Sequence, residues 1–138
     1  NLVYWRNGSY YGFGMGAASY VQGQRFSRPR NRDAYAGWLQ GYVAQEGRID
    51  EPITSESDRL FETFMLGLRR SCGVDLTVLG DGFGCDRIER LRESLKIYED
   101  KGWVIFSADS RMCLGDPDGF LFSNTVLVSL WEFLLAIN

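Results

Sequence analysis

The stretch from Tyr11 to Tyr20 reads YGFGMGAASY and places glycine at three alternate positions. Glycines at alternate positions remove the side chains from one face of a strand. A planar ligand or another stretch of backbone can then lie directly against that face. A tight bend that requires small residues explains the same pattern about as well, so the glycines alone leave both interpretations open.

The same stretch also matches the spacing G-x-G-x-x-A of dinucleotide-binding loops. In such loops a helix opens at the glycines, and an acidic residue ends the following strand. Here the glycines lead into VQGQ at 21–24 and then into a basic segment that contains Pro29. We therefore reject a dinucleotide site and expect a flat strand surface from Gly12 to Tyr20.

The composition excludes several classes of site. The chain has 138 residues, 45% of them hydrophobic, and a net charge of −3, which gives no bulk attraction to nucleic acids. It contains no histidine, which excludes His-based triads, HExxH zinc sites and histidine-ligated heme within it. The spacing of Cys72, Cys85 and Cys113 fits no metal site, so we expect buried structural thiols in a reducing compartment. The apolar run at 120–137 is too short and too polar for a membrane span.

The first 50 residues alternate short β-prone runs with turns. Leu2 to Trp5 predicts a strand, Asn7-Gly8 a turn, and residues 10–13 a second strand. Residues 25–32 predict an irregular basic loop. A helix is predicted from 33 to 45, with one face formed by Tyr35, Trp38, Leu39, Tyr42 and Val43. A polar linker then runs from 46 to 52, and we place a domain boundary there, between 1–50 and 51–138.

Residues 51–138 predict a small helical domain. Ser55 is an N-cap candidate for a helix whose apolar face is formed by Leu60, Phe61, Phe64, Met65 and Leu68 and which Gly73 can close. A second helix is predicted at 86–101. Residues 103–106 and 111–114 predict a β-hairpin, and a last helix follows to about Leu135. The fold class is therefore α+β, and the second domain is winged-helix-like.

Several motifs together resemble the oxygen-independent coproporphyrinogen III oxidase-like family, the HemN/HemW group of radical S-adenosylmethionine proteins. NLVYW at 1–5, followed by GFGMGAAS at 12–19, is similar to the family's N-L-x-Y-W and G-F-G-x-G-A-x-S strands. MLGLR at 65–69 with GVDL at 73–76 is similar to its M-x-G-L-R and G-[VL]-D-L signature. Further similar motifs follow in the expected order: FG at 83–84, GWV at 102–104 and GFLFSN at 119–124.

Two positions depart from the family pattern. Met15 stands where many HemW-type members carry proline, and Ala18 stands where they carry histidine, so any role of that histidine is absent. The segments 25–30 and 116–121 look closest to the plant and algal branch. The resemblance therefore implies an intracellular protein, in the cytoplasm or, for that branch, in a chloroplast or mitochondrion.

The resemblance implies that residues 1–50 are the last strands of an incomplete radical S-adenosylmethionine α/β barrel. It implies that 51–138 are the terminal domain of a longer parent protein. The family's chemistry needs a four-iron cluster held by C-x-x-x-C-x-x-C, and this spacing is absent from the sequence. We therefore expect no catalytic residue or metal ligand here. The cluster and S-adenosylmethionine would be bound by the parent, so this segment alone is not an enzyme.

The resemblance and the glycine pattern together place one wall of a cofactor or substrate site on this chain. Its predicted residues are Trp5, Phe13, Gly14, Met15, Gly16 and Ala17, with Gly14 and Gly16 allowing close approach. Contacts to porphyrin propionates are predicted from Arg25, Arg28 and Arg30, because guanidinium groups pair with carboxylates. A solvated loop without a ligand, or a contact to RNA, would explain the same arginines.

For the parent protein the resemblance implies heme binding and delivery of heme to a target protein. The alternatives are a coproporphyrinogen III oxidase, which decarboxylates propionates, and a non-catalytic docking module of a larger assembly. The expected partners are heme or another porphyrin, the rest of the parent chain, and a protein recipient. DNA is not expected, because the basic and acidic side chains of 86–101 offset one another.

Overall fold

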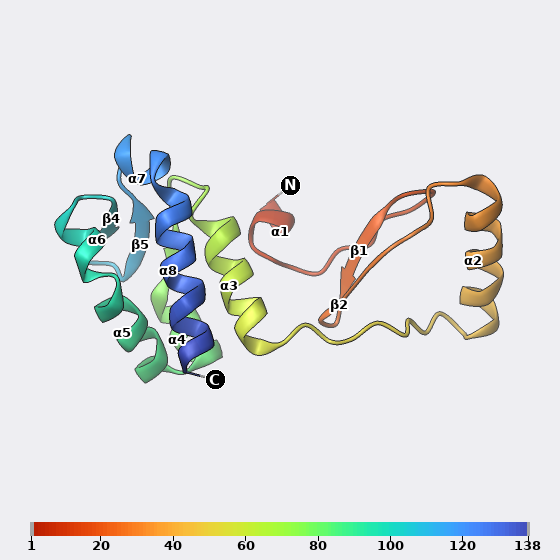
Figure 1. Cartoon of the computed structure of the whole chain (residues 1–138). Helices are drawn as coiled ribbons and strands as arrows, with labels where there is room; N and C mark the ends of the chain where they lie inside the picture. The colour runs from red at the N-terminus through yellow and green to blue at the C-terminus, as the bar shows by residue number, and fades with distance from the viewer. Residues whose placement is uncertain (1, 138) are drawn as a thin grey trace. The chain divides into compact units, whose positions relative to one another are not determined.

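A computed structural model of the chain describes residues 2–137 and divides it into two compact units, Asn1–Ser55 and Glu56–Asn138. Both units are mixtures of helices and small antiparallel sheets, so the expected α+β class is confirmed at this level (Figure 1). The two units are described separately below.

The first unit is built around a β-hairpin and one helix. Strands β1 (Ala18–Val21) and β2 (Gln24–Ser27) pair antiparallel, with Ala18 opposite Ser27 and Val21 opposite Gln24 (Figure 1). The turn residues Gln22 and Gly23 have φ of 50° and 79°, and two positive φ values are typical of a two-residue hairpin turn. Helix α2 (Arg32–Ala44) follows and confirms the helix predicted at 33–45. Its N-cap is Asn31, whose side chain accepts hydrogen bonds from the amides of Asp33 and Ala34.

The predicted strand at Leu2–Trp5 is wrong, because these residues form a short helix, α1 (Leu2–Trp5). The amide of Gly8 donates to the Val3 carbonyl at 2.9 Å, and that of Asn7 donates to Tyr4 at 3.1 Å. With Asn7 at a φ of 54°, this is the hydrogen-bond pattern of a Schellman cap. The Asn7-Gly8 pair thus ends a helix instead of joining two strands, and Asn1, the first residue of the similar motif, lies outside the described residues.

The predicted strand surface from Gly12 to Tyr20 is largely wrong, because regular pairing begins only at Ala18. Gly14 and Gly16 have φ of 90° and 71°, which lies in the left-handed region and is incompatible with a strand. Before Ala18, only Tyr10 forms an isolated bridge, with Tyr20. The glycines therefore serve a bend, which is the second of the two interpretations that the sequence left open.

The predicted basic loop is shorter than residues 25–32. Arg25 lies inside β2, and Arg32 is the first residue of α2. Only the segment from Arg28 to Asn31 connects the hairpin to the helix.

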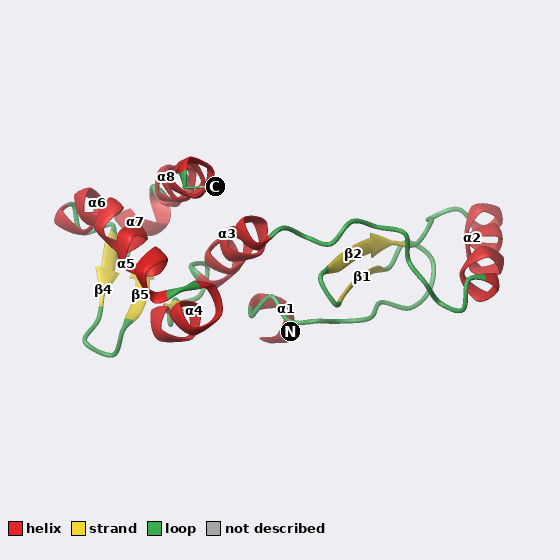
Figure 2. Ribbon diagram, turned by 90° about the horizontal axis from the view of Figure 1, so that it is seen from below, coloured by secondary structure: helices red, strands yellow, loops and turns green. Residues whose placement is uncertain are grey.

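The second unit contains more elements than the sequence predicts. They are α3 (Glu56–Gly67), β3 (Val74–Asp75), α4 (Leu76–Phe83), α5 (Cys85–Ser94), α6 (Lys96–Asp100), β4 (Val104–Phe106), β5 (Arg111–Leu114), α7 (Asp118–Leu121) and α8 (Ser123–Ala136). The strands form one antiparallel sheet in the order β3–β5–β4. Its strands β4 and β5 lie side by side in Figure 2. The predicted hairpin and last helix are confirmed. The predicted helix at 86–101 is interrupted at Leu95, and both β3 and α4 were missed.

Helix α4 has a clear local cause. The Asp75 carboxylate accepts hydrogen bonds from the amides of Thr77 at 3.0 Å and Val78 at 3.2 Å, so it caps the helix. Gly84, with a φ of 101°, separates α4 from α5.

The core of the second unit gathers apolar residues from most of its elements. Helices α3 and α8 lie side by side, and each carries one buried face (Figure 1). The buried core residues are Leu60, Phe64, Leu68, Val74, Leu76, Leu79, Ile88, Leu91, Leu95, Val104, Met112, Leu114, Val126, Leu130 and Leu134. None of the described helices is long and apolar enough to cross a lipid bilayer.

Candidate ligand site

The first unit encloses an arginine among aromatic rings. Arg28 follows directly after β2, and only 8% of its surface is exposed. Its guanidinium carbon lies 5.3 Å from the ring centroid of Trp38, 5.7 Å from that of Phe26 and 5.9 Å from that of Phe13. These distances are within the range of cation–π contacts, which stabilise a cation where water is excluded.

Backbone and side-chain hydrogen bonds hold Arg28 in place. Its amide donates to the Ala17 carbonyl at 2.9 Å, which ties it to the glycine-containing bend. Its Nη1 donates to Oγ of Ser19 at 3.3 Å, and the amide of Gly12 donates to the same oxygen at 3.0 Å. Ser19 is completely buried. Its hydroxyl therefore connects the bend to the arginine, and the position of one fixes that of the other.

Helix α2 contributes a flat aromatic surface. Tyr35, Trp38 and Tyr42 recur at helical spacing, so they share one face. The planes of Tyr35 and Trp38 differ by 12° and those of Trp38 and Tyr42 by 13°, with centroids 6.2 Å and 5.0 Å apart. Phe26 stacks on Trp38 at 6.3 Å. The predicted face is confirmed for these three helix residues. Leu39 is 42% exposed but lies beside them, and Val43 is 69% exposed.

A cavity of about 370 Å³ lies between the bend and α2. Its lining residues are Tyr11, Phe13, Gly14, Arg28, Tyr35, Trp38, Leu39 and Tyr42. The lining contains aromatic rings and one cation but no carboxylate. Burial of a charge costs free energy unless an opposite charge or hydrogen bonds offset it. The cavity is therefore suited to a flat ligand that carries an anionic group.

The structure brings some of the predicted wall residues together. Phe13 and Gly14 line the cavity with Arg28, and Ala17 contributes its carbonyl to the Arg28 amide. Met15 is exposed and is not among the lining residues. Trp5 lies on α1, where its ring and that of Tyr4 are nearly perpendicular, with centroids 5.6 Å apart.

The three predicted propionate contacts lie in different surroundings. Arg28 lines the cavity, whereas the guanidinium of Arg25 lies over the Tyr20 ring at 4.9 Å. The exposed Arg30 places its side-chain stem next to Gly16, where an added Cβ would lie 3.1 Å from Cγ of Arg30. Sequence reasoning treated the arginines alike, and only the fold separates them.

Sequence reasoning also missed several residues of this site: Tyr11, Ser19, Tyr35, Trp38 and Tyr42. The spacing of the three aromatic residues on α2 was visible, but it was interpreted only as the apolar face of a helix. Ser19 gave no signal, because a small polar residue in a strand is ordinary in sequence. Its role depends on the bend that brings Gly12 to it.

Gly12 is expected to be essential for the shape of the bend. A Cβ at this position would contact the Ala18 carbonyl oxygen and lie 2.9 Å from Cβ of Ala17. We expect Gly12→Ala to lower the stability of the first unit by about 1–3 kcal/mol, because overpacking must move the backbone. Hydrogen exchange of peptides from residues 1–55 would measure this loss. Gly37→Ala is the control, because Gly37 lies in α2, where an added Cβ would meet open space, and unchanged exchange in Gly12→Ala would contradict the expectation.

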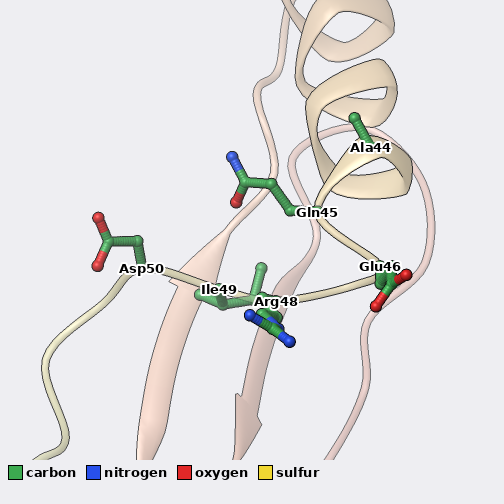
Figure 3. A pocket seen from close by; sticks show the side chains of 6 residues that line it. All are labelled: Ala44, Gln45, Glu46, Arg48, Ile49 and Asp50. Carbon is green, nitrogen blue, oxygen red and sulfur yellow. The ribbon is translucent and has the colours of Figure 1, made fainter.

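A larger hollow of about 530 Å³ lies at the end of α2, lined by Ala44, Gln45, Glu46, Arg48, Ile49 and Asp50 (Figure 3). These residues follow one another closely along the chain, and nearly all are exposed. Gln24 Nε2 donates to the carbonyls of Ile49 at 3.0 Å and Glu51 at 2.7 Å, which holds the linker against β2. The hollow contains charges of both signs and no buried polar group, so its chemistry points to no ligand.

The expectation of buried cysteines is wrong for Cys72 and Cys85, which are exposed, and Cys113 is half-buried. Burial raises the pKa of the Cys113 thiol, and the neighbouring Arg111 opposes this shift. Within the described part of the chain, no three side chains of the metal-binding types come together. The cysteines present here therefore do not fit an iron–sulfur cluster.

Three curated proteins are similar to this chain. The heme chaperone HemW of Synechocystis sp. is 36% identical over 97% of the chain. The heme chaperone HemW of Bacillus subtilis is 30% identical over 91% of the chain. The heme chaperone HemW of Lactococcus lactis is 31% identical over 73% of the chain. The chain spans only about a third of the length of these relatives, at 36%, 32% and 27%.

No protein-family model matches the chain, and no solved structure matches it. The resemblance found in the sequence motifs and the similarity to three HemW proteins agree. The chain is a HemW/HemN-like sequence.

Proposed function

We propose that this chain is part of a heme chaperone and takes part in holding the heme that such a protein delivers. The observation that carries this proposal is the 36% identity to a heme chaperone over 97% of the chain. The chemistry of the cavity supports it. A heme is a flat aromatic ring with two carboxylates, and the cavity combines stacked aromatic side chains with one buried guanidinium.

The parent protein would be a radical S-adenosylmethionine protein, with residues 1–50 at the end of its barrel. The motifs at 1–5 and 12–19 support this assignment. The parent would bind S-adenosylmethionine and a four-iron cluster. In that setting Trp5, Phe13, Gly14, Met15, Gly16 and Ala17 would form one wall of the site. Such a protein would act inside the cell. If it belongs to the plant and algal branch, it would be located in a chloroplast or mitochondrion.

The second unit would be a winged-helix module that docks a protein. Helices α3, α4 and α5 precede the β4–β5 hairpin, and β3 pairs with the outer side of β5, which supports this arrangement. Helix α5 carries Asp86, Glu89 and Glu93 beside its three arginines. Phosphate contacts need a net basic surface, so the charges favour a protein partner, such as the heme recipient or the rest of the parent, over DNA.

Titration of the full chain with hemin tests its part in this function. We expect a saturable change in the Soret band at one heme per chain, because the cavity offers one guanidinium. Incubation of the loaded chain and the loaded parent with an apo-hemoprotein would measure transfer. Lack of saturable binding by the chain would overturn the proposal for this segment. Turnover of coproporphyrinogen by the cluster-loaded parent would establish the oxidase instead.

A further inference from the structure

We infer that the cavity around Arg28 receives a carboxylate at the edge of a porphyrin ring. This chain would recognise the ring through that carboxylate and the face of Trp38, and not through the iron. The inference rests on the proposed function and deepens it, because it assigns the part of the ligand that this segment binds.

The burial of Arg28 points to an anionic group on the ligand. Arg25 and Arg30 are exposed, as is usual for arginine, whereas Arg28 is 8% exposed. Its side chain reaches three aromatic rings and one serine hydroxyl. None of these is an anion, and no carboxylate lines the cavity. A carboxylate brought by a ligand would accept charge-assisted hydrogen bonds from the guanidinium, which are stronger than neutral ones.

The flat surface beside the guanidinium points to a ring on the same ligand. The Phe13 ring is 86% exposed although it belongs to the cavity lining, so a ligand ring can cover it. Tyr35, Trp38 and Tyr42 present nearly parallel rings. The cavity volume of about 370 Å³ is near the lower end for ligand sites, which suits one edge of a macrocycle better than a whole one.

The side chains that line the cavity are poorly suited to bind iron. The chain has no histidine, and its cysteines, Cys72, Cys85 and Cys113, all belong to the second unit. Three tyrosines line the cavity. Tyr35 and Tyr42 have their rings stacked on Trp38, and Tyr11, which is 56% exposed, is the one remaining phenol of the lining. The lining therefore offers contacts for the ring and its carboxylate in preference to an axial ligand for iron.

A comparison of ligands tests the inference on the unmodified chain. Mesoporphyrin IX carries two carboxylates and its dimethyl ester carries none, while hemin is the iron complex of the closely related protoporphyrin IX. We expect the ester to bind at least about tenfold more weakly than the acid, and the metal-free acid to bind within about tenfold of hemin. Equal binding of acid and ester would overturn the inference. So would much tighter binding of hemin with a tyrosinate-to-iron charge-transfer band.

A pair of variants locates the contact. Arg28→Gln removes the cavity cation, and Arg25→Gln removes an exposed arginine of the same hairpin that lies over Tyr20. We expect at least about a tenfold loss of mesoporphyrin affinity for Arg28→Gln and little change for Arg25→Gln. Circular dichroism would verify that both variants fold. If Arg28→Gln is unfolded, the comparison of acid with ester still decides the question.

The outcomes separate this inference from the proposed function. Suppose that hemin binds, that the ester binds as tightly as the acid, and that Arg28→Gln binds mesoporphyrin as tightly as the unmodified chain. Heme binding then stands, and the carboxylate contact is wrong. If no porphyrin binds, both are wrong for this segment. S-adenosylmethionine also joins an aromatic ring to a carboxylate, so it serves as a third ligand. Displacement of mesoporphyrin by equimolar S-adenosylmethionine would assign the cavity to that compound and overturn the inference.

Discussion

Replacement of Leu130 by alanine is expected to lower the free energy of unfolding of the second unit by about 2–5 kcal/mol. Leu130 lies in the middle of α8 and is completely buried, among residues of α3, α5 and the sheet. The truncation removes buried methyl groups and leaves a cavity that the surrounding helices fill only in part. The whole stability of a domain of this size is about 5–15 kcal/mol, so the loss is a large share of it.

The same helix provides the control for this prediction. Leu135 is also a leucine of α8, but it is 55% exposed. Leu135→Ala should change stability by no more than about 0.5 kcal/mol, as is typical of surface positions. Urea unfolding followed by hydrogen exchange would measure the stability of both variants. Peptides from α3 and α8 report on the second unit alone, so its stability is distinguished from that of the first unit. Equal effects of the two substitutions would show that α8 does not pack as described.

In the second unit, the sequence predicted best those helices whose apolar period is complete within the helix itself. The helical period of Leu60, Phe64 and Leu68 appears in the structure as one buried face, and Leu130 belongs to the predicted last helix. Helix α4 was missed because it is short and its start depends on the Asp75 cap, which resembles any loop aspartate in sequence. The interruption at Leu95 was missed because the apolar period continues through it.

The first unit was predicted less well, because its glycines have two physical uses that look alike in sequence. A strand face without side chains and a left-handed bend both require glycine, and alternation favours the first. The positive φ of Gly14 and Gly16 decides for the second. The consequence for the site is direct. The bend, not a strand face, carries Phe13 and Gly14 to Arg28.

Arg28 illustrates what only the tertiary structure reveals. Its neighbours in the chain, Arg25 and Arg30, share its residue type and the same basic segment. What distinguishes Arg28 is a buried serine from β1 and an indole from α2, which lie nine and ten residues away along the chain. The sequence could thus nominate a group of arginines, but it could not choose among them.

Replacement of Gly73 by alanine is expected to destabilise the second unit by about 2–5 kcal/mol, the sum of two costs. The φ of 59° costs a side-chain-bearing residue about 1–2 kcal/mol. In addition, a Cβ at Gly73 would contact the carbonyl oxygen of Met112 and lie 2.9 Å from the sulfur of Cys113, which adds about 1–3 kcal/mol of overpacking. Strand β5 would have to move away from the chain that leads into β3.

Gly82→Ala is the matched control for this prediction, because Gly82 lies in α4 with no atom near the position of an added Cβ. It should be stabilising by up to about 1 kcal/mol, since alanine favours a helix. Hydrogen exchange at β3 and β5 would compare the two variants, and a Gly73→Ala protein as stable as the unmodified chain would contradict the described approach of the strands.

Within the motifs at 65–69 and 73–76, Gly67 lies against Val74, Gly73 against Met112, and Asp75 caps α4. These motif residues therefore specify how the second unit packs, and the ligand chemistry of the chain is to be sought around Arg28.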